Sequence, residues 1–170
     1  MAYDEDLANR IRELVADEPG LTEKHGDEAA AEVARKFRRT MRGLSRRHGA
    51  WEVKTMGDGI MLWVSNAAQA IALAAGAVEQ VQASVDLPPV RVGVHTGPAV
   101  MQGSDWFGSA VNVAARLADE AAPGEALISA ATRSAACGAM TGPLLTGPLM
   151  TGREIVLRGL ERPIVAWRLG

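Results

Sequence analysis

Two apolar segments around a glycine-rich turn constrain the fold more than any other feature of this chain. Residues 53–63 read VKTMGDGIMLW, and the apolar segments 51–56 and 60–64 flank Gly57-Asp58-Gly59. An Asp-Gly pair between two such segments is a strong signal for a β-hairpin, because glycine tolerates the positive φ angles of tight turns. The pattern therefore predicts two adjacent antiparallel strands, around which the rest of the fold has to be built.

Hydrophobic periodicity divides the rest of the chain into further helices and strands. Helical spacing of apolar residues predicts helices over 4–16, 27–47, 66–85, 110–121 and 130–136. Short or alternating apolar runs predict strands over 89–95, 126–129, 154–157 and 164–168. Residues 99–101 follow Gly97-Pro98 and can pair back onto the preceding strand. This order predicts an α/β fold, a ferredoxin-like mixed sheet with helices packed on one face.

Composition fits one globular domain without a membrane span. The chain has 170 residues, of which 48% are hydrophobic and 22% are charged, and its formal net charge is −2. No global field therefore attracts it to nucleic acid or membrane, and its longest apolar stretch, 71–78, is too short to cross a bilayer. Cys137 is the only cysteine, which excludes an internal disulfide and is typical of a reducing compartment. We expect a cytoplasmic protein, because the acidic N-terminus lacks a signal-peptide core.

Basic residues crowd the predicted helix 27–47, which raises the alternative of nucleic-acid binding. Acidic residues precede them, an apolar stripe occupies the remaining face, and cations are favoured near the C-terminal end of a helix. These features favour a solvated helix surface and no nucleic-acid partner. Strong salt-dependent retention on DNA would support the alternative.

Four polar residues are candidates for chemistry. Asp58 is either an ordinary turn residue or a ligand for Mg²⁺, which prefers one or two carboxylates together with substrate phosphates. Lys54 either protects an edge strand or contacts a ligand. Asn112 and Arg116 are four residues apart and so share one helix face, where they form either an incidental polar stripe or an anion-binding pair. The guanidinium fork of arginine matches phosphate oxygens.

Three motifs, VKTMGDGIM, VRVGVHTG and DWFGSAVNVAARL, occur in an order and spacing that resemble class III nucleotidyl cyclases. The resemblance covers the chain from about residue 25 and implies a cyclase homology domain over 25–170. It further implies a head-to-tail homodimer with shared active sites and the conversion of ATP to 3′,5′-cyclic AMP and pyrophosphate. Such lyases serve intracellular signal transduction and need Mg²⁺ or Mn²⁺, with two ions per site.

The resemblance also implies a role for each candidate residue. Asp58 matches the second metal-binding aspartate of the family. Lys54 and Asp105 match the pair that reads adenine, the lysine by donating to ring N1 and the aspartate by accepting from the amino group. Asn112 matches the residue that orients the ribose, and Arg116 matches the residue that contacts the phosphates. Lys54 and Asp58 would then serve different active sites of one dimer.

The N-terminal segment departs from the family pattern. Asp17, Gly20 and Thr22 keep the spacing of the motif that carries the first metal-binding aspartate. Residues 9–14, however, have helical periodicity and are polar for a central strand. The segment 1–24 resembles the start of TfoX-like proteins, and it would then be an atypical helical segment in place of the first strand. Asp17 is a metal ligand in one interpretation and a bystander in the other.

The N-terminal alternatives lead to two functional hypotheses. Without a carboxylate at the position of Asp17, a loss of about a thousandfold in rate is expected. The chain is then either an adenylyl cyclase, which is weakened if Asp17 is not a ligand, or an inactive cyclase-homology module that binds nucleotide or dimerises as a regulator.

The family also has a phosphate-binding lysine near the C-terminus. The cation closest to its position in this chain is Arg158.

Overall fold

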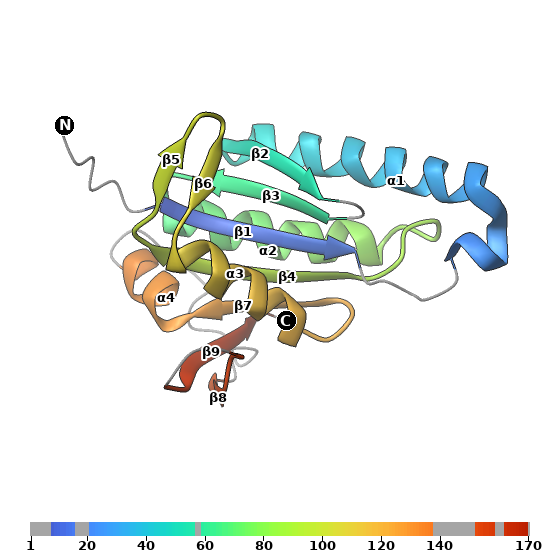
Figure 1. Cartoon of the computed structure of the whole chain (residues 1–170). Coiled ribbons are helices and arrows are strands. Elements are labelled where there is room, and N and C mark those ends of the chain that lie inside the picture. Colours follow the sequence, from blue (N-terminus) through green and yellow to red (C-terminus); the bar gives the residue numbers. More distant parts are fainter. Residues whose placement is uncertain (1–7, 16–20, 57–58, 138–151, 159–161, 170) are drawn as a thin grey trace.

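A seven-stranded sheet runs through the molecule (Figure 1). The structure, a computed structural model, describes residues 8–15, 21–56, 59–137, 152–158 and 162–169. Each strand is antiparallel to its neighbours except for β4 and β7, which are parallel. In spatial order the strands are β2 (Ala50–Met56), β3 (Gly59–Val64), β1 (Ala8–Val15), β4 (Val90–Gly97), β7 (Glu125–Ser129), β9 (Ile164–Leu169) and β8 (Gly152–Ile155). The predicted mixed sheet is confirmed.

The helices predicted beyond residue 25 are also confirmed. They are α1 (Leu21–Arg47), α2 (Ala67–Gln82), α3 (Ser109–Glu120) and α4 (Ala130–Ala136). Asn66 caps the start of α2: its side-chain oxygen accepts the backbone N–H groups of Ala68 at 2.9 Å and Gln69 at 3.1 Å. Such a bond satisfies donors that the first turn of a helix leaves unpaired.

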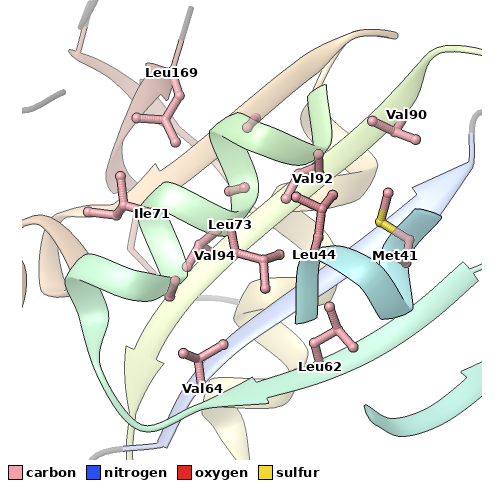
Figure 2. Packing of buried hydrophobic residues seen from close by; sticks show 14 of the residues in the cluster. Met41, Leu44, Leu62, Val64, Ile71, Leu73, Val90, Val92, Val94 and Leu169 are labelled. Carbon is pink, nitrogen blue, oxygen red and sulfur yellow. The ribbon is translucent and has the colours of Figure 1, made fainter. Parts of the chain in front are cut away.

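The larger hydrophobic core lies between the sheet and helices α1 and α2. Figure 2 shows Met41 and Leu44 of α1 packed toward strand residues such as Leu62, with α2 closing the same layer. These side chains are at most 2% exposed. Along β3 and β4 the contributing residues alternate, as one face of a sheet requires; they are Ile60, Leu62, Val64, Val90, Val92 and Val94.

Helix α3 packs on the opposite face of the sheet, so the prediction that the helices share one face is wrong. A second hydrophobic cluster joins Val113 and Leu117 of α3 to Leu127 of β7. Gly93 of β4 permits this packing, since a Cβ atom there would lie 2.2 Å from the backbone oxygen of Ala114. Periodicity alone identifies an amphipathic helix without specifying which face of the sheet it covers.

Residues Ala8–Val15 form strand β1, so the helix predicted over 4–16 is wrong. The strand lies between β3 and β4 and pairs with both, with Ile11 opposite Leu62 on one side and Val94 on the other (Figure 1). The expectation that a helical segment stands in place of the first strand is therefore wrong as well. Because both neighbours offer backbone hydrogen-bonding groups to this segment, pairing along two edges outweighs its local helix propensity. The resemblance of 1–24 to TfoX-like proteins stays a hypothesis.

A separate two-stranded sheet follows β4. Strand β5 (Val100–Gln102) pairs antiparallel with β6 (Asp105–Phe107). The expectation that 99–101 would pair back onto β4 is therefore wrong, because β6 supplies the partner. This hairpin projects beside β2 and β3 and leads directly into α3 (Figure 1).

The basic residues of α1 lie in a network of surface contacts. Arg35 pairs with Glu32 and Lys36 pairs with Asp86. The Arg42 guanidinium pairs with Glu52 at 3.0 Å, and its hydrogen bond lowers the pKa of that carboxyl group. Among the helices that the structure describes, none combines the length and hydropathy that crossing a membrane requires.

Candidate active site

Lys54 and Asp105, which lie 51 residues apart in the chain, meet in an ion pair. The Nζ atom of Lys54 on β2 is 2.5 Å from the Oδ2 atom of Asp105 on β6. The backbone N–H of Trp106 donates to the other carboxylate oxygen of Asp105 at 2.7 Å. The Lys54 ammonium also lies 5.9 Å from the ring centroid of Phe107. The two residues proposed to read adenine are therefore brought together at one place.

This ion pair contributes little to stability. The side chain of Lys54 is 38% exposed and that of Asp105 is 28% exposed. Ion pairs that remain accessible to water are typically worth between about 0 and 1 kcal/mol, because solvent screens them. A donor and an acceptor held side by side at a partly open position can instead recognise a ligand that presents the complementary pair.

Helix α3 carries the other two candidates, Asn112 and Arg116. Asn112 is exposed and Arg116 is half-buried, whereas Ala110 and Ala114 face the sheet. The helix begins after Gly108, whose φ of 136° is readily adopted by glycine. Its first turn starts two residues after β6, so the helix continues directly from the strand that carries Asp105. The structure places both candidates on the same helix as predicted, one turn apart.

Two glycines of β4 hold α3 close to the sheet, and sequence reasoning missed their role. Gly93 leaves no room for a Cβ atom against the backbone of α3, and a Cβ atom at Gly97 would lie 3.2 Å from that of Ala110. A glycine inside a strand commonly marks such a close approach. The V-G-V pattern at 92–94 could therefore have indicated that another segment packs closely against this strand.

A polar network lies beneath the start of α3. His95 of β4 and Ser129 of β7 are 2.9 Å apart between Nδ1 and Oγ, and Ser129 is in turn 3.1 Å from the Thr132 hydroxyl. Thr96 donates to the same Thr132 hydroxyl at 3.2 Å. Burial lowers the pKa of His95 to about 4, so the imidazole is neutral at physiological pH. The network thus joins the end of β4 to β7 and α4 without placing a charge in the interior.

Two tryptophans beside the ion pair form a second contact that the sequence did not reveal. The rings of Trp63 on β3 and Trp106 on β6 are stacked, with centroids 5.8 Å apart and an interplanar angle of 7°. Trp106 is adjacent to Asp105 in the chain. No periodicity connects two residues that are 43 positions apart on different sheets, and only the fold brings them together.

The two proposed metal ligands, Asp17 and Asp58, lie outside the described residues. Their flanking strands are described, and Leu14 near the end of β1 pairs with Gly59 at the start of β3. The chain therefore leaves β1 toward Asp17 and enters β3 from Asp58 at the same end of neighbouring strands. Within the described ranges, no cluster of three or more His, Cys, Asp or Glu side chains could hold a metal ion.

The carboxylates of Asp17 and Asp58 have the donor chemistry for hard divalent cations, because Mg²⁺ takes one or two carboxylates and completes its shell with water or phosphate oxygens. Arg158, the candidate phosphate-binding cation, lies on an exposed turn after β8. The structure shows no contact that assigns it a role among the described residues.

The chain matches the family of adenylate and guanylate cyclase catalytic domains over residues 19–140. It is 35% identical over 131 residues to a pH-sensitive adenylate cyclase of Mycobacterium tuberculosis, covering 75% of this chain and 33% of that protein. An adenylate cyclase of Streptomyces griseus is 31% identical over 134 residues, covering 76% of this chain and 34% of that protein. The chain thus spans about a third of the length of these relatives.

Solved structures of cyclases share the fold. An adenylate/guanylate cyclase/hydrolase from Silicibacter pomeroyi superposes with a TM-score of 0.81 at 25% identity, covering 96% of this chain and 95% of that one. An adenylate cyclase from Trypanosoma brucei in its monomeric state gives a TM-score of 0.80 at 23% identity, covering 96% of this chain and 89% of that one. With the family match over most of its length, the chain belongs to the adenylate and guanylate cyclase catalytic domain family.

Proposed function

We propose that the protein is an adenylyl cyclase that converts ATP to 3′,5′-cyclic AMP and pyrophosphate at a site shared by two copies of the chain. The observation that carries this proposal is the Lys54–Asp105 pair, with 2.5 Å between Nζ and Oδ2. Adenine presents an acceptor at N1 beside a donor amino group. Guanine presents a donor at N1 beside an acceptor at O6. A lysine beside a carboxylate can pair with either edge. In the order that the family resemblance implies, with lysine at N1 and aspartate at the amino group, the pair fits adenine.

Four residues of one chain form one half of the proposed site, and each has a defined task in the reaction. Lys54 donates to adenine N1, and Asp105 accepts from the amino group. Asn112 orients the ribose so that its 3′-oxygen faces the α-phosphorus. Arg116 donates to phosphate oxygens and meets the negative charge that grows there in the transition state. The bond from the 3′-oxygen to the α-phosphorus forms while the bond to the pyrophosphate oxygen breaks, and the hydroxyl proton passes to solvent.

Asp58 and Asp17 of the partner copy would hold two Mg²⁺ or Mn²⁺ ions, which lower the pKa of the attacking hydroxyl and neutralise the phosphates. The pairing of Leu14 with Gly59 supports a common position for these aspartates at one end of the sheet. Lys54 would bind the base, and Asp58 would bind the metal ions at the phosphates. Because they are only four residues apart in one chain, they cannot reach both ends of the same nucleotide, which supports sites built from two chains. Apolar side chains exposed on the β5–β6 hairpin support a partner surface; they are Val100, Met101 and Phe107.

Incubation of the purified protein with ATP and Mn²⁺ tests this function by the appearance of cyclic AMP. We expect Asp58→Ala to lower the rate by about a thousandfold, because it removes a ligand for the ions. Asp17→Ala should have a comparable effect if Asp17 is the second ligand. Asp86→Ala removes a surface aspartate that pairs with Lys36, so it serves as the matched control and should retain activity.

The same assay separates an enzyme from an inactive module. No cyclic AMP at high protein concentration, with ATP binding retained, would favour the cyclase-homology module that only binds nucleotide or dimerises. A loss of activity in Asp58→Ala with full activity in Asp17→Ala would make Asp17 a bystander.

A further inference from the structure

We propose that Trp63 is a positioning residue for nucleobase recognition, acting by stacking on Trp106 and so setting the place of Asp105 relative to Lys54. The inference rests on the proposed function, in which Lys54 and Asp105 read adenine. Trp63 itself has no role in the proposed chemistry.

The orientation of Trp63 places it where it can support the hairpin. Its neighbours Leu62 and Val64 belong to the core beneath α1 and α2, so Trp63 points to the opposite face of β3 by the alternation of a strand. There its ring lies nearly parallel to that of Trp106, at 7° and 5.8 Å between centroids. Stacked aromatic rings at this separation attract one another beyond simple burial of area.

No hydrogen bond to a described residue orients the Trp63 ring. The Nε1 atom of Trp63 is buried and has no hydrogen-bond partner among the residues that the structure describes. A tryptophan whose N–H found a partner would be oriented by that polar contact. Trp63 instead contributes a flat surface, which is what holding a second ring requires.

The β5–β6 hairpin depends on such side-chain contacts. It forms a two-stranded sheet of its own, with three residues in each strand, and its strands are not paired with any described strand of the seven-stranded sheet. Isolated two-stranded hairpins are marginally stable in water, and the partly exposed Lys54–Asp105 ion pair contributes little to holding the hairpin in place. The tryptophan stack supplies a second attachment between the sheet and the strand that carries Asp105.

The test compares Trp63→Leu with the wild-type protein in the ratio of kcat/KM for ATP to kcat/KM for GTP. We expect the ratio to fall between about threefold and about tenfold, the fold-change that corresponds to one stacked aromatic pair. The fall should arise mainly from a higher KM for ATP. This ratio is independent of the concentration of active enzyme, so partial misfolding of the variant does not change it.

Two further variants distinguish a positioning role of Trp63 from a general contribution to packing. Trp63→Phe keeps an aromatic surface and should recover most of the ATP preference. Trp51→Leu makes the same kind of change at the residue directly opposite Trp63 on β2, which is 71% exposed, and should leave the preference unchanged. Equal losses in Trp51→Leu and Trp63→Leu would overturn the proposal.

A double variant tests whether Trp63 acts through Asp105. In an Asp105→Asn background the base-reading pair is already broken, so adding Trp63→Leu should change the ATP-to-GTP ratio by less than about twofold. The same loss in both backgrounds would contradict the inference while leaving the cyclase activity in place. A wild-type protein that neither binds ATP nor forms cyclic AMP would instead overturn the proposed function, and this inference with it.

Discussion

The two faces of the sheet are packed in different ways. Beneath α1 and α2 the sheet is covered by large aliphatic side chains that are almost fully buried, such as Leu62 and Ile71. The α3 face also has an aliphatic cluster, which includes Leu117 and Leu127. Its contacts nearest the candidate site are made by glycine and alanine, by a stacked tryptophan pair and by a hydrogen-bonded histidine. On the first face, buried apolar side chains fill space, and one can be replaced by another of similar size. The second face adds specific contacts to its aliphatic cluster.

This difference separates what stabilises the fold from what positions the candidate site. The residues proposed to contact ATP, Lys54, Asp105, Asn112 and Arg116, lie on β2, β6 and α3. The distance of α3 from the sheet is set by Gly93, and the position of β6 depends on a side-chain stack. Changes on the first face should therefore lower stability, and changes on the second should alter activity in the molecules that remain folded.

Leu62→Ala is expected to have the largest effect on stability. The side chain is 0% exposed, and emptying such a site typically lowers the free energy of unfolding by about 3 to 4 kcal/mol. Urea denaturation measures this loss. Activity per folded molecule should stay near the wild-type value, and a selective loss of activity in this variant would remove the distinction between the faces.

Gly93→Ala should lower stability and activity together. The added Cβ atom would lie 2.2 Å from the Ala114 oxygen and 2.4 Å from the Ala118 nitrogen, so α3 has to move away. We expect a loss of about 2 to 3 kcal/mol and, because Asn112 and Arg116 move with the helix, a fall in activity of about a hundredfold.

Gly43→Ala is the matched control for this change. Gly43 lies in α1, and a Cβ atom there would meet nothing within 4 Å. The free energy of unfolding should therefore rise by about 0.5 to 1 kcal/mol, because alanine loses less conformational entropy than glycine when the helix forms. If Gly93→Ala behaved like Gly43→Ala, the close approach of α3 would not matter for the site.

His95 predicts a pH dependence of stability. Its pKa of about 4 in the folded protein lies below the unfolded value of 6.5, so the unfolded chain binds more protons between these values. The free energy of unfolding therefore falls as the pH drops from 6.5 toward 4, by about 2 kcal/mol at pH 5. Denaturation of the wild-type protein and His95→Gln across this range isolates the contribution, and equal slopes for the two proteins would contradict it.

Lys54→Ala should have the smallest effect on stability, less than about 1 kcal/mol, because the ion pair is partly exposed. Its effect on ATP should be large by comparison, with KM rising by about tenfold or more through the loss of a charge-assisted hydrogen bond. Thermal denaturation and initial-rate kinetics on the same preparation measure both quantities. A strongly destabilised variant with unchanged KM would assign this pair to the fold.

Much of the fold could be predicted from local patterns. The Asp-Gly turn predicts the β2–β3 hairpin, helical spacing of apolar residues predicts α2, and alternating apolar residues predict β4. Strand β1 could not be predicted in this way, because its polar residues are held by pairing with β3 and β4 on both edges. Local propensity does not include partners that are distant in the sequence.

Residue type and spacing made Lys54, Asn112 and Arg116 candidates, but their roles could be assigned only through the family motifs. Nothing in the spacing of Lys54 and Asp105 indicates that their side chains meet, and their contact depends on β6 reaching β2. The face on which α3 packs could have been inferred from Gly93, since a glycine between buried valines indicates a neighbouring backbone. The Trp63–Trp106 stack has no counterpart in local pattern, because it joins two separate sheets.

The most direct test of the central claim mixes two variants that we expect to be nearly inactive, Arg116→Ala in the half of the site that binds the base and Asp58→Ala at the metal ligands, under conditions in which the chains exchange. A site that takes its base-reading residues from one chain and its metal ligands from the other predicts one intact site in every mixed dimer. Random exchange then restores about a quarter of wild-type cyclic AMP formation, since half of the dimers are mixed and each has one of two sites intact. A mixture that forms dimers yet stays as inactive as its components, beside an active wild-type protein, would contradict the account.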